Sequence, residues 1–333
     1  MTFLSCALIA LTMVLQGSAL ASPLTDEKGD SSVVLRFGGD CLLAGHFEKA
    51  VRDSVDLPFA GFDLLREADI GMVNLESPIT RRGAKIQKPF NFRMHPKYVA
   101  SLTRAGIDIV NIANNHIFDY GNEGLFDTIS YLDSAHVLHV GAGRSREEAR
   151  RPAVVKVKDQ KIGFVGYYGG GEAPVAGENT PGVAARTIQI ILDDLRLLRQ
   201  RDSVNFVVVT LHWGTEKAEF PDEGQRQFAR EIIDGGADAV IGHHPHVLQG
   251  IERYKSGVIV YSLGNFIFGG LERDSYDTGL FEIKIAKEKT TFTFLPVGIR
   301  GWNARALHGP DAARVLDIIR TRSSSFPNSL FTN

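Results

Sequence analysis

The sequence is poor in cysteine. Its 333 residues contain two, Cys6 and Cys41, and Cys6 lies in an N-terminal segment that we expect to be removed. A single cysteine cannot form a disulfide within the mature chain, so an apolar core must stabilise the fold. With 44% hydrophobic residues, a chain of this length can bury such a core.

An excess of charge and several familiar motifs are also missing. The formal net charge is -2, and no basic run is interleaved with aromatic residues, so we expect no nucleic-acid partner. No Gly-x-Ser-x-Gly elbow is present, which argues against Ser/His/Asp catalysis. The P-loop and the dinucleotide-binding fingerprint are absent as well, which excludes the classes that they define.

One apolar run stands at the N-terminus. Residues 3–15 are almost uniformly apolar but are short for a membrane span, and small residues follow at Ala19 and Ala21. We therefore expect a signal peptide over residues 1–21, a polar spacer over 22–32, and export to the periplasm or cell surface. No Lys or Arg precedes the apolar run, so an uncleaved segment that anchors the protein in the membrane is the alternative.

Strands and helices alternate through the first three-quarters of the chain, which predicts an α/β sheet. Strands are predicted at 33–37, 70–75, 107–113, 153–157, 161–165, 206–211 and 239–241. Helices are predicted at 47–51, 62–68, 94–105, 124–135, 188–201 and 224–234. A strand-only stretch at 258–262, 279–285 and 291–297 predicts a second, antiparallel or mixed sheet. Since no linker divides the chain, we expect one domain over 33–300 and a C-terminal extension over 301–333 that contains a helix.

Polar groups follow the ends of the predicted strands. They are Gly39-Asp40, Asn74-Leu75-Glu76, Asn114-Asn115-His116, His212-Trp213-Gly214 and Gly242-His243-His244-Pro245-His246. An α/β sheet carries its functional groups at strand ends, where rigid backbone gives way to exposed loop. We therefore expect these distant groups to meet in one cleft.

The residue types in these groups indicate a metal centre. Carboxylate and amide oxygens come from Asp40, Glu76 and Asn115, and imidazoles come from His116, His212, His244 and His246. Such a mixture suits a hydrolytic centre with one or two ions, in which the ion activates water and a histidine moves a proton. The histidine cluster is the strongest signal, because packing does not explain three imidazoles in four positions.

Each smaller group also has a purely structural interpretation. Asp40 could cap the following helix, Glu76 could form an ion pair at the rim, and Asn114-Asn115 could form a turn. The candidate substrate-binding residues are Asn74, Asn114, His243, Asn265, Arg81 and Arg82. The two arginines belong to a basic stretch over 80–88, with Lys85 and Lys88, that we expect to be an exposed loop.

In this order, the five groups and Ser262-Leu263-Gly264-Asn265-Phe266 resemble the CapA family of bacterial capsule-synthesis or poly-γ-glutamate proteins. The resemblance extends from about Val33 to about Val297. The family is in turn similar to calcineurin-like metallophosphoesterases. This similarity implies a metallophosphatase-like four-layer α/β/β/α sandwich with two mixed sheets and the site at strand ends.

The resemblance also implies roles. Asp40 matches the first metal aspartate, Glu76 the bridging carboxylate, Asn115 the metal asparagine and His116 the catalytic histidine. The metal histidines correspond to His212, His244 and His246. Leu42 stands where these phosphoesterases have a further histidine. One divalent ion (Mn, Zn or Fe) is therefore expected rather than two, with His116, Asp40 and Glu76 as the catalytic residues.

The function that the resemblance implies is the synthesis, transfer or processing of an anionic envelope polymer. Poly-γ-glutamate is the leading candidate for this polymer. A metal-dependent hydrolase or transferase would do this, or the His/Asp/Glu cluster would act directly without a metal. Membrane-bound capsule-synthesis machinery is the expected partner. Arg81 and Arg82 would meet the acidic chain. Two alternatives stay open: a non-catalytic component for polymer export or anchoring, and a metallophosphoesterase.

Overall fold

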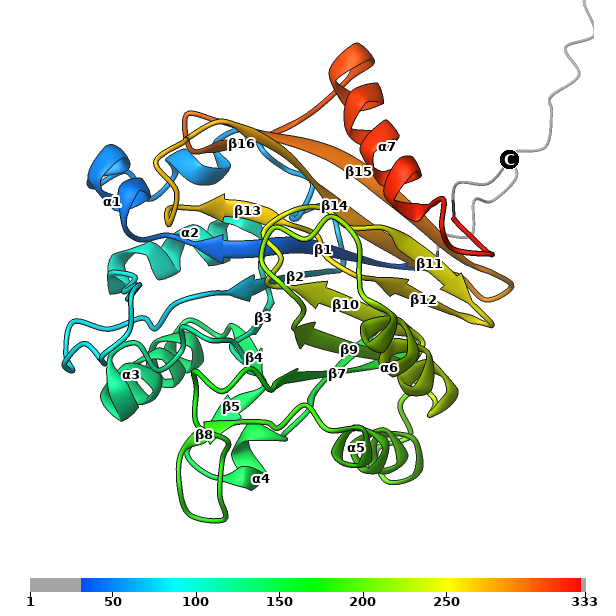
Figure 1. The fold of residues 1–333 in the computed structure, drawn as a ribbon, viewed down its shortest axis with the longest axis horizontal. Helices are drawn as coiled ribbons and strands as arrows, with labels where there is room; N and C mark the ends of the chain where they lie inside the picture. The colour runs from blue at the N-terminus through cyan, green and yellow to red at the C-terminus, as the bar shows by residue number, and fades with distance from the viewer. Residues whose placement is uncertain (1–30, 331–333) are drawn as a thin grey trace, which may run out of the picture. The chain divides into compact units, whose positions relative to one another are not determined.

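The computed structural model describes residues 31–330 (Figure 1). The expected signal peptide, and all of the spacer but its last two residues, lie outside the described residues. Within 31–330, no helix combines the length and apolar character that a membrane crossing requires.

The first sheet is mixed and is built around the strand β1. Its strand order is β16 (Asn303–Ala306), β15 (Thr290–Arg300), β14 (Tyr276–Ile285), β1 (Val33–Leu42), β2 (Ile70–Leu75), β3 (Ile109–Asn111) and β4 (Leu138–Val140). β1 pairs antiparallel with β14 and parallel with β2. A further strand, β13 (Asn265–Phe268), pairs parallel with the end of β1. The strands β1, β2, β3, β4 and β13 therefore run in the same direction toward one edge, because β3 pairs parallel with β2 and β4 pairs parallel with β3.

The second sheet is also mixed. Its strand order is β11 (Ile251–Tyr254), β12 (Gly257–Val260), β10 (Ala239–His243), β9 (Phe206–His212), β7 (Gln160–Tyr168) and β6 (Ala153–Val157). The inner strands β7, β9, β10 and β12 are parallel to one another. At the two edges of the sheet, β6 pairs antiparallel with β7 and β11 pairs antiparallel with β12. A small ribbon joins β5 (Ala142–Gly143) and β8 (Gly182–Val183).

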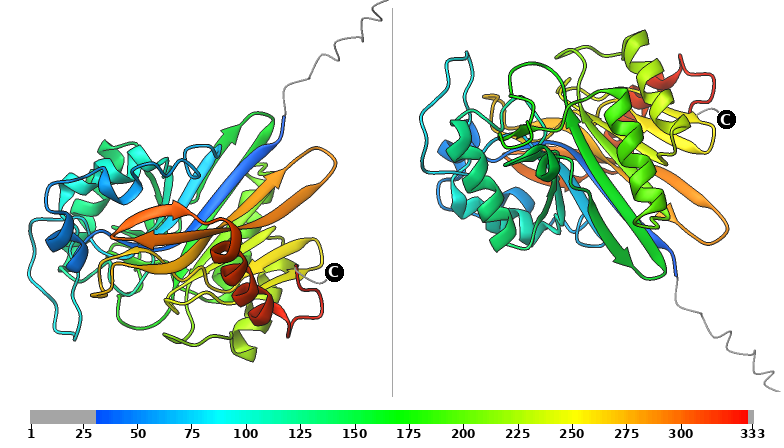
Figure 2. Two further views of the ribbon diagram at one scale, coloured as in Figure 1. Left: turned by 90° about the horizontal axis from the view of Figure 1, so that it is seen from above. Right: turned by 90° about the horizontal axis from the view of Figure 1, so that it is seen from below.

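The two sheets face each other across an apolar core that includes Phe37, Met72, Phe164 and Ile241. The outer face of the first sheet packs against α1 (His46–Val51), α2 (Val99–Ala105) and α3 (Gly121–Ser134). The outer face of the second packs against α5 (Ile188–Gln200) and α6 (Glu223–Asp234). Figure 2 shows these helix groups on opposite sides of the paired sheets. The predicted four-layer α/β/β/α sandwich with two mixed sheets is therefore confirmed.

Three shorter elements and a C-terminal helix complete the fold. The short ones are α4 (Arg146–Ala149) and the 3-10 helices η1 (Leu57–Phe59) and η2 (Pro96–Tyr98). The helix α7 (Gly309–Ser323) buries Val315 and Ile319 in the core between the sheets. β16 and α7 both belong to the predicted C-terminal extension, so its described part, residues 301–330, is packed onto the domain.

The predicted helix over 62–68 was wrong. Phe62 and Leu65 are buried as expected, but the segment forms turns, with one helix-type hydrogen bond from Glu67 N to Asp63 O. The chain must reverse here into β2, and the Asp69 carboxylate accepts from the backbone of Val34 at 2.8 Å. A contact with a neighbouring strand therefore ends the turn before a helix can extend.

Two other predicted elements are shorter than expected. The helix over 94–105 begins at Val99, because η2 occupies its first turn. The strand over 107–113 reduces to β3, because the Asn111 side chain bonds to the backbone of Ala113 in place of the sheet.

Candidate metal centre

The parallel strands place the predicted residues at one edge of the two sheets. In the first sheet Asp40 pairs with Asn74 across β1 and β2. In the second, His212 pairs with His243 across β9 and β10. Since the two sheets face each other, oxygen donors from one and imidazoles from the other meet at this edge.

Glycine allows a close approach at the end of β1. A Cβ at position 39 would lie 2.0 Å from the Gly264 carbonyl oxygen, so only glycine fits there. The same oxygen accepts a hydrogen bond from the backbone of Asp40 at 2.8 Å. This contact seats β13 against β1 and pairs Asp40 with Asn265.

The histidine loop after β10 has unusual backbone geometry. His244 and His246 have positive φ angles of 98° and 58°, a region that residues other than glycine rarely adopt. The backbone N–H of His244 donates to the Asp40 carboxylate at 3.2 Å. Such conformations occur at functional sites, where the surrounding structure holds them. Here the loop turns both imidazoles toward the carboxylates.

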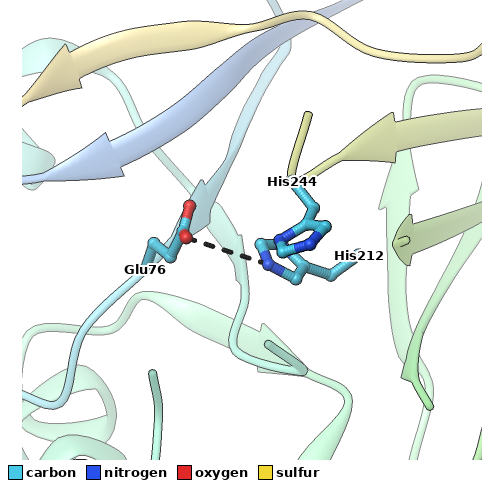
Figure 3. Close-up of side chains that lie close together, drawn as sticks. All are labelled: Glu76, His212 and His244. Atoms are coloured by element: carbon cyan, nitrogen blue, oxygen red, sulfur yellow. Dashed lines mark ion pairs between the residues drawn. The ribbon is translucent and has the colours of Figure 1, made fainter. Parts of the chain in front are cut away.

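Glu76 lies at the centre of the cluster and is completely buried. Its Oε1 lies 3.5 Å from His246 Nε2, 3.8 Å from His212 Nε2 and 4.0 Å from His116 Nε2. Figure 3 shows the carboxylate directed at His212, with His244 beside that ring. Oε1 accepts no hydrogen bond among the described residues. Burial and repulsion from Asp40 raise the pKa of Glu76 well above its usual range.

Asp40 is the second buried carboxylate. It accepts a hydrogen bond from Asn74 Nδ2 at 2.8 Å, and its Oδ2 lies 3.3 Å from His246 Nδ1. Burial alone would raise the pKa of Asp40, but His246 outweighs it and holds that pKa below its usual value. Burial likewise opposes the charge of His246, yet Glu76 and Asp40 raise its pKa to about 10.

The other imidazoles favour the neutral state that binds metals. Burial and the neighbouring histidines lower the pKa of His212 well below its usual range. Burial and His246 also lower the pKa of His244. His212 Nε2 lies 2.9 Å from Asn115 Oδ1, so Asn115, which was also predicted as a metal ligand, lies in the cluster.

The donor atoms form sets that fit a divalent ion. Within residues 31–330, three sets of side chains bring one donor atom each to within 4.8 Å of one another. They are Glu76 with His212 and His244, Asp40 with Glu76 and His246, and Glu216 with His244 and His246. Carboxylate and imidazole ligands suit Zn, Mn or Fe. A cation would also give Glu76 Oε1 the partner that it lacks among the described residues. All six predicted metal residues thus lie together, and Glu216, on an exposed loop, was not predicted.

Leu42 contributes an apolar wall in place of a donor. It is buried with Ala44 and Phe268, and Phe92 packs against this group. The Phe92 ring centre lies 4.7 Å from that of His116, and the Phe268 ring centre 4.6 Å from that of His246. Leu42 therefore supports two aromatic rings, Phe92 and Phe268, that pack against the imidazoles of His116 and His246.

His116 is held by residues that the sequence analysis did not select. Its Nδ1 lies 2.8 Å from Asp119 Oδ2, which leaves Nε2 toward Glu76. Lys88 Nζ lies 2.6 Å from Asp119 Oδ1 and donates to the Asn115 carbonyl at 2.7 Å. Lys88 is thus part of the site's support, with a side chain that is 10% exposed, and is not a free cation of a surface loop. The spacing of three residues from His116 to Asp119 was the available signal.

The predicted substrate-binding residues divide into three groups. Asn74 and Asn114 are buried: Asn74 Oδ1 accepts from Asn114 at 3.3 Å and from Asn111, another residue that was not selected, at 2.9 Å. His243 is buried as well, 3.6 Å from Asp40, and burial lowers its pKa to about 4. The two asparagines hold the metal residues in place through hydrogen bonds, and His243 packs beside Asp40.

Asn265 and the two arginines differ from them. Asn265 Oδ1 lies 2.8 Å from His246 Nδ1, beside a cavity. Arg81 and Arg82 are exposed, and Arg82 forms an ion pair with Asp127 of α3. Among residues 31–330, neither arginine has a hydrogen bond or ion pair with a residue of the cluster, so the structure does not bring them to it.

Two facing sheets with acids, asparagine and histidines at the strand ends define a protein of the metallophosphatase fold class. The NAD nucleotidase NadN of Haemophilus influenzae shares the fold, with a TM-score of 0.50 and 13% identity. The match covers 90% of this chain and 57% of that one.

The chain belongs to the family of bacterial capsule synthesis proteins PGA_cap, whose model matches residues 34–270. The PGA biosynthesis protein CapA of Bacillus subtilis is 32% identical over 291 residues, covering 84% of this chain and 74% of that protein. The capsule biosynthesis protein CapA of Bacillus anthracis is 30% identical over 273 residues, covering 78% of this chain. This chain spans 65% of the length of the B. anthracis protein. The resemblance found in the sequence is therefore confirmed.

Proposed function

We propose that this protein is a metal-assisted hydrolase or transferase that acts on an anionic envelope polymer, and that poly-γ-glutamate is the leading candidate for this polymer. The observation that carries the proposal is the environment of Glu76 Oε1. This buried oxygen accepts no hydrogen bond among residues 31–330 and lies within 4.0 Å of three histidine nitrogens. The choice of polymer is supported by the names of the two relatives, which refer to PGA and capsule biosynthesis.

The residues have separate roles in this proposal. Glu76, Asn115, His212 and His244 would hold one ion (Mn, Zn or Fe), and Asp40 fixes the histidine loop. When bound, the ion supplies Lewis-acid polarisation of a substrate carbonyl and a more acidic water.

Proton transfer falls to His116. Asp119 holds its Nδ1, and its Nε2 is turned toward the cluster. A protonated His116 can therefore give its proton to the leaving amine of a cleaved γ-amide. The asparagines and His243 keep these groups in position.

The proposal includes the place of action. The apolar segment at 3–15 supports export to the periplasm or cell surface, either after cleavage or with the segment kept as an anchor. There the protein would work beside membrane-bound capsule-synthesis machinery.

Metal analysis combined with polymer cleavage tests the proposal. Purified protein, Glu76→Gln, His244→Ala and His116→Ala are measured for bound metal and for new amino termini released from poly-γ-glutamate. We expect stoichiometric metal in the wild type and its loss in Glu76→Gln and His244→Ala. His116→Ala should keep the metal and lose about 10²- to 10⁴-fold in rate. His308→Ala is the matched control, because this exposed side chain makes no capping contact.

The same variants separate the alternatives when capsule formation in cells and hydrolysis of phosphate esters are measured as well. If His116→Ala and His244→Ala both support capsule formation in cells, a non-catalytic export or anchoring component is the better explanation. If the protein hydrolyses phosphate esters and leaves poly-γ-glutamate intact, it is a metallophosphoesterase. Either result rejects the proposed activity on the polymer.

A further inference from the structure

A cavity of about 350 Å³ adjoins the metal centre on the side of β13. His246 and Asn265 line its inner end, and Arg273, Tyr276, Asp277 and Arg322 line the rest. The volume falls within the roughly 300–1,000 Å³ of ordinary ligand pockets. Because His246 belongs to both the metal centre and the cavity, a molecule in the cavity would reach the centre directly.

The charges in this cavity are unequally partnered. Asp277 forms ion pairs with Arg300 and Arg314, and Arg322 forms one with Glu219. Arg273 has no ion pair among residues 31–330, although Glu272 and Asp274 flank it in the sequence. Of Arg273, Asp277 and Arg322, only Arg273 therefore has a charged group without an ion-pair partner among residues 31–330, and this guanidinium can bind an anion.

Tyr276 fixes the position of Arg273. The guanidinium carbon lies 5.5 Å from the centre of the tyrosine ring, a cation–π contact. The tyrosine hydroxyl donates to the Phe266 carbonyl at 2.6 Å and accepts from the Phe268 N–H at 2.8 Å. Both partners belong to β13, the strand that begins at Asn265. The arginine and the inner end of the cavity are therefore connected through one strand.

Asn265 provides a second, independent sign of a ligand. Its side chain is 4% exposed, and Oδ1 is engaged by His246. Its Nδ2 donates to no acceptor among the described residues. A buried donor without an acceptor is costly, which indicates that a ligand oxygen takes this hydrogen bond.

A second cavity of about 370 Å³ lies next to the first, because both are lined by Ile318 and Arg322 of α7. Phe220 and Arg314 line it as well, together with Glu219 and Asp317, each of which forms an ion pair with an arginine. We call the two neighbouring cavities together the groove.

We propose that this groove binds the substrate chain, with Arg273 holding a carboxylate and Asn265 Nδ2 donating to a chain oxygen near the metal centre. The inference rests on the proposed function and deepens it by assigning the polymer's path. Arg273 is then a specificity-determining residue, since the planar fork of arginine matches a carboxylate.

Binding of a short fluorescein-labelled oligomer of γ-linked glutamate to the metal-loaded protein tests the inference. Fluorescence anisotropy is measured for the wild type, Arg273→Ala and Arg273→Lys. We expect Arg273→Ala to weaken binding roughly ten- to a hundredfold, and Arg273→Lys to weaken it less, because it keeps the charge but loses the fork. Bound metal and the unfolding midpoint should match the wild type in each variant.

Arg320→Ala is the matched control, because Arg320 is an exposed arginine of α7 that lines neither cavity. Unchanged binding by Arg273→Ala, or equal weakening by Arg320→Ala, would overturn the inference and leave the proposed function standing. A wild-type protein that binds inorganic phosphate and not the oligomer would overturn both. Normal binding with the Arg273 effect, but no cleavage by any form, would overturn only the proposed reaction.

Discussion

Glu76 belongs to two of the three donor sets, and its charge is unfavourable unless a cation is present. In metal-free protein, Glu76→Gln removes a carboxyl group whose ionisation burial disfavours, so we expect the free energy of unfolding to rise by about 1–3 kcal/mol. With Mn²⁺ at a thousandfold excess over its dissociation constant the order should reverse. An ion that binds only the folded wild type then adds about 4.1 kcal/mol, and the variant lacks this gain.

Urea unfolding in EDTA and in Mn²⁺ measures both effects of Glu76→Gln. Glu231→Gln, at an exposed position of α6, is the control and should match the wild type in both conditions. A Glu76→Gln protein that gains as much stability from Mn²⁺ as the wild type would show that the ion does not bind at Glu76.

Asp119 acts on the chemistry through His116. In the wild type, the Asp119 carboxylate accepts a hydrogen bond from His116 Nδ1. The amide of Asp119→Asn can instead place its N–H donor against the His116 ring. We expect kcat on poly-γ-glutamate to fall about 10- to 100-fold with KM little changed, as for other residues that orient a catalytic group. Metal content should stay normal, because Asp119 belongs to none of the donor sets.

Asp159→Asn is a matched control for this substitution, since it makes the same change at an exposed hairpin turn. A raised KM with unchanged kcat would place Asp119 in substrate binding. Loss of metal from Asp119→Asn would make it part of the centre's framework. Both results contradict a positioning role.

At the scale of elements, the strand ends could be predicted and the contacts between loops could not. Asp40, Glu76 and His212 each follow an apolar run, so their common edge follows from the parallel pairing of buried strands. Lys88 and Asp119 lie on separate loops, and only the folded chain shows that they form an ion pair. The wall around Leu42 likewise depends on Phe268, far along the chain.

An ion pair between Arg314 and Asp277 adds to the apolar attachment of α7 and links it to β14. Burial would raise the pKa of Asp277, but Arg300 and Arg314 outweigh it and hold that pKa below its usual value. The charged form is therefore favoured by folding, so the stabilisation is complete above about pH 4 and is lost as the pH falls through the folded pKa. We expect Asp277→Asn to cost about 1 kcal/mol at pH 7, since the pairs are partly open to solvent.

Unfolding free energies from pH 7 down to pH 3 check this expectation. The difference between wild type and Asp277→Asn should be constant to about pH 4 and shrink below it. Asp317→Asn, in an exposed pair with Arg320 at 3.7 Å, should change stability little at any pH. A difference that grows on acidification has the wrong sign for a carboxylate with a lowered pKa and would reject the argument.

At the scale of the whole molecule, residues 301–330 complete the core between the sheets. β16 pairs with β15, and α7 buries Val315 and Ile319 beside Ile251. A helix was predicted there without its partner, because periodicity reveals an apolar face but not what covers it. The apolar face of α7 covers the end of the same core that both sheets share.

A chain that ends at Arg300 should therefore fail to form a native core. It loses β16 and α7, leaves the Ile251 backbone without the Ser323 hydroxyl that it contacts at 2.9 Å, and opens the inter-sheet core to water. We expect no cooperative thermal transition and no near-ultraviolet circular dichroism signal. Ile319→Ala in the full chain should cost about 2–5 kcal/mol, and Arg320→Ala close to nothing. A truncated protein that unfolds cooperatively near the wild-type midpoint would instead make 301–333 a separable extension.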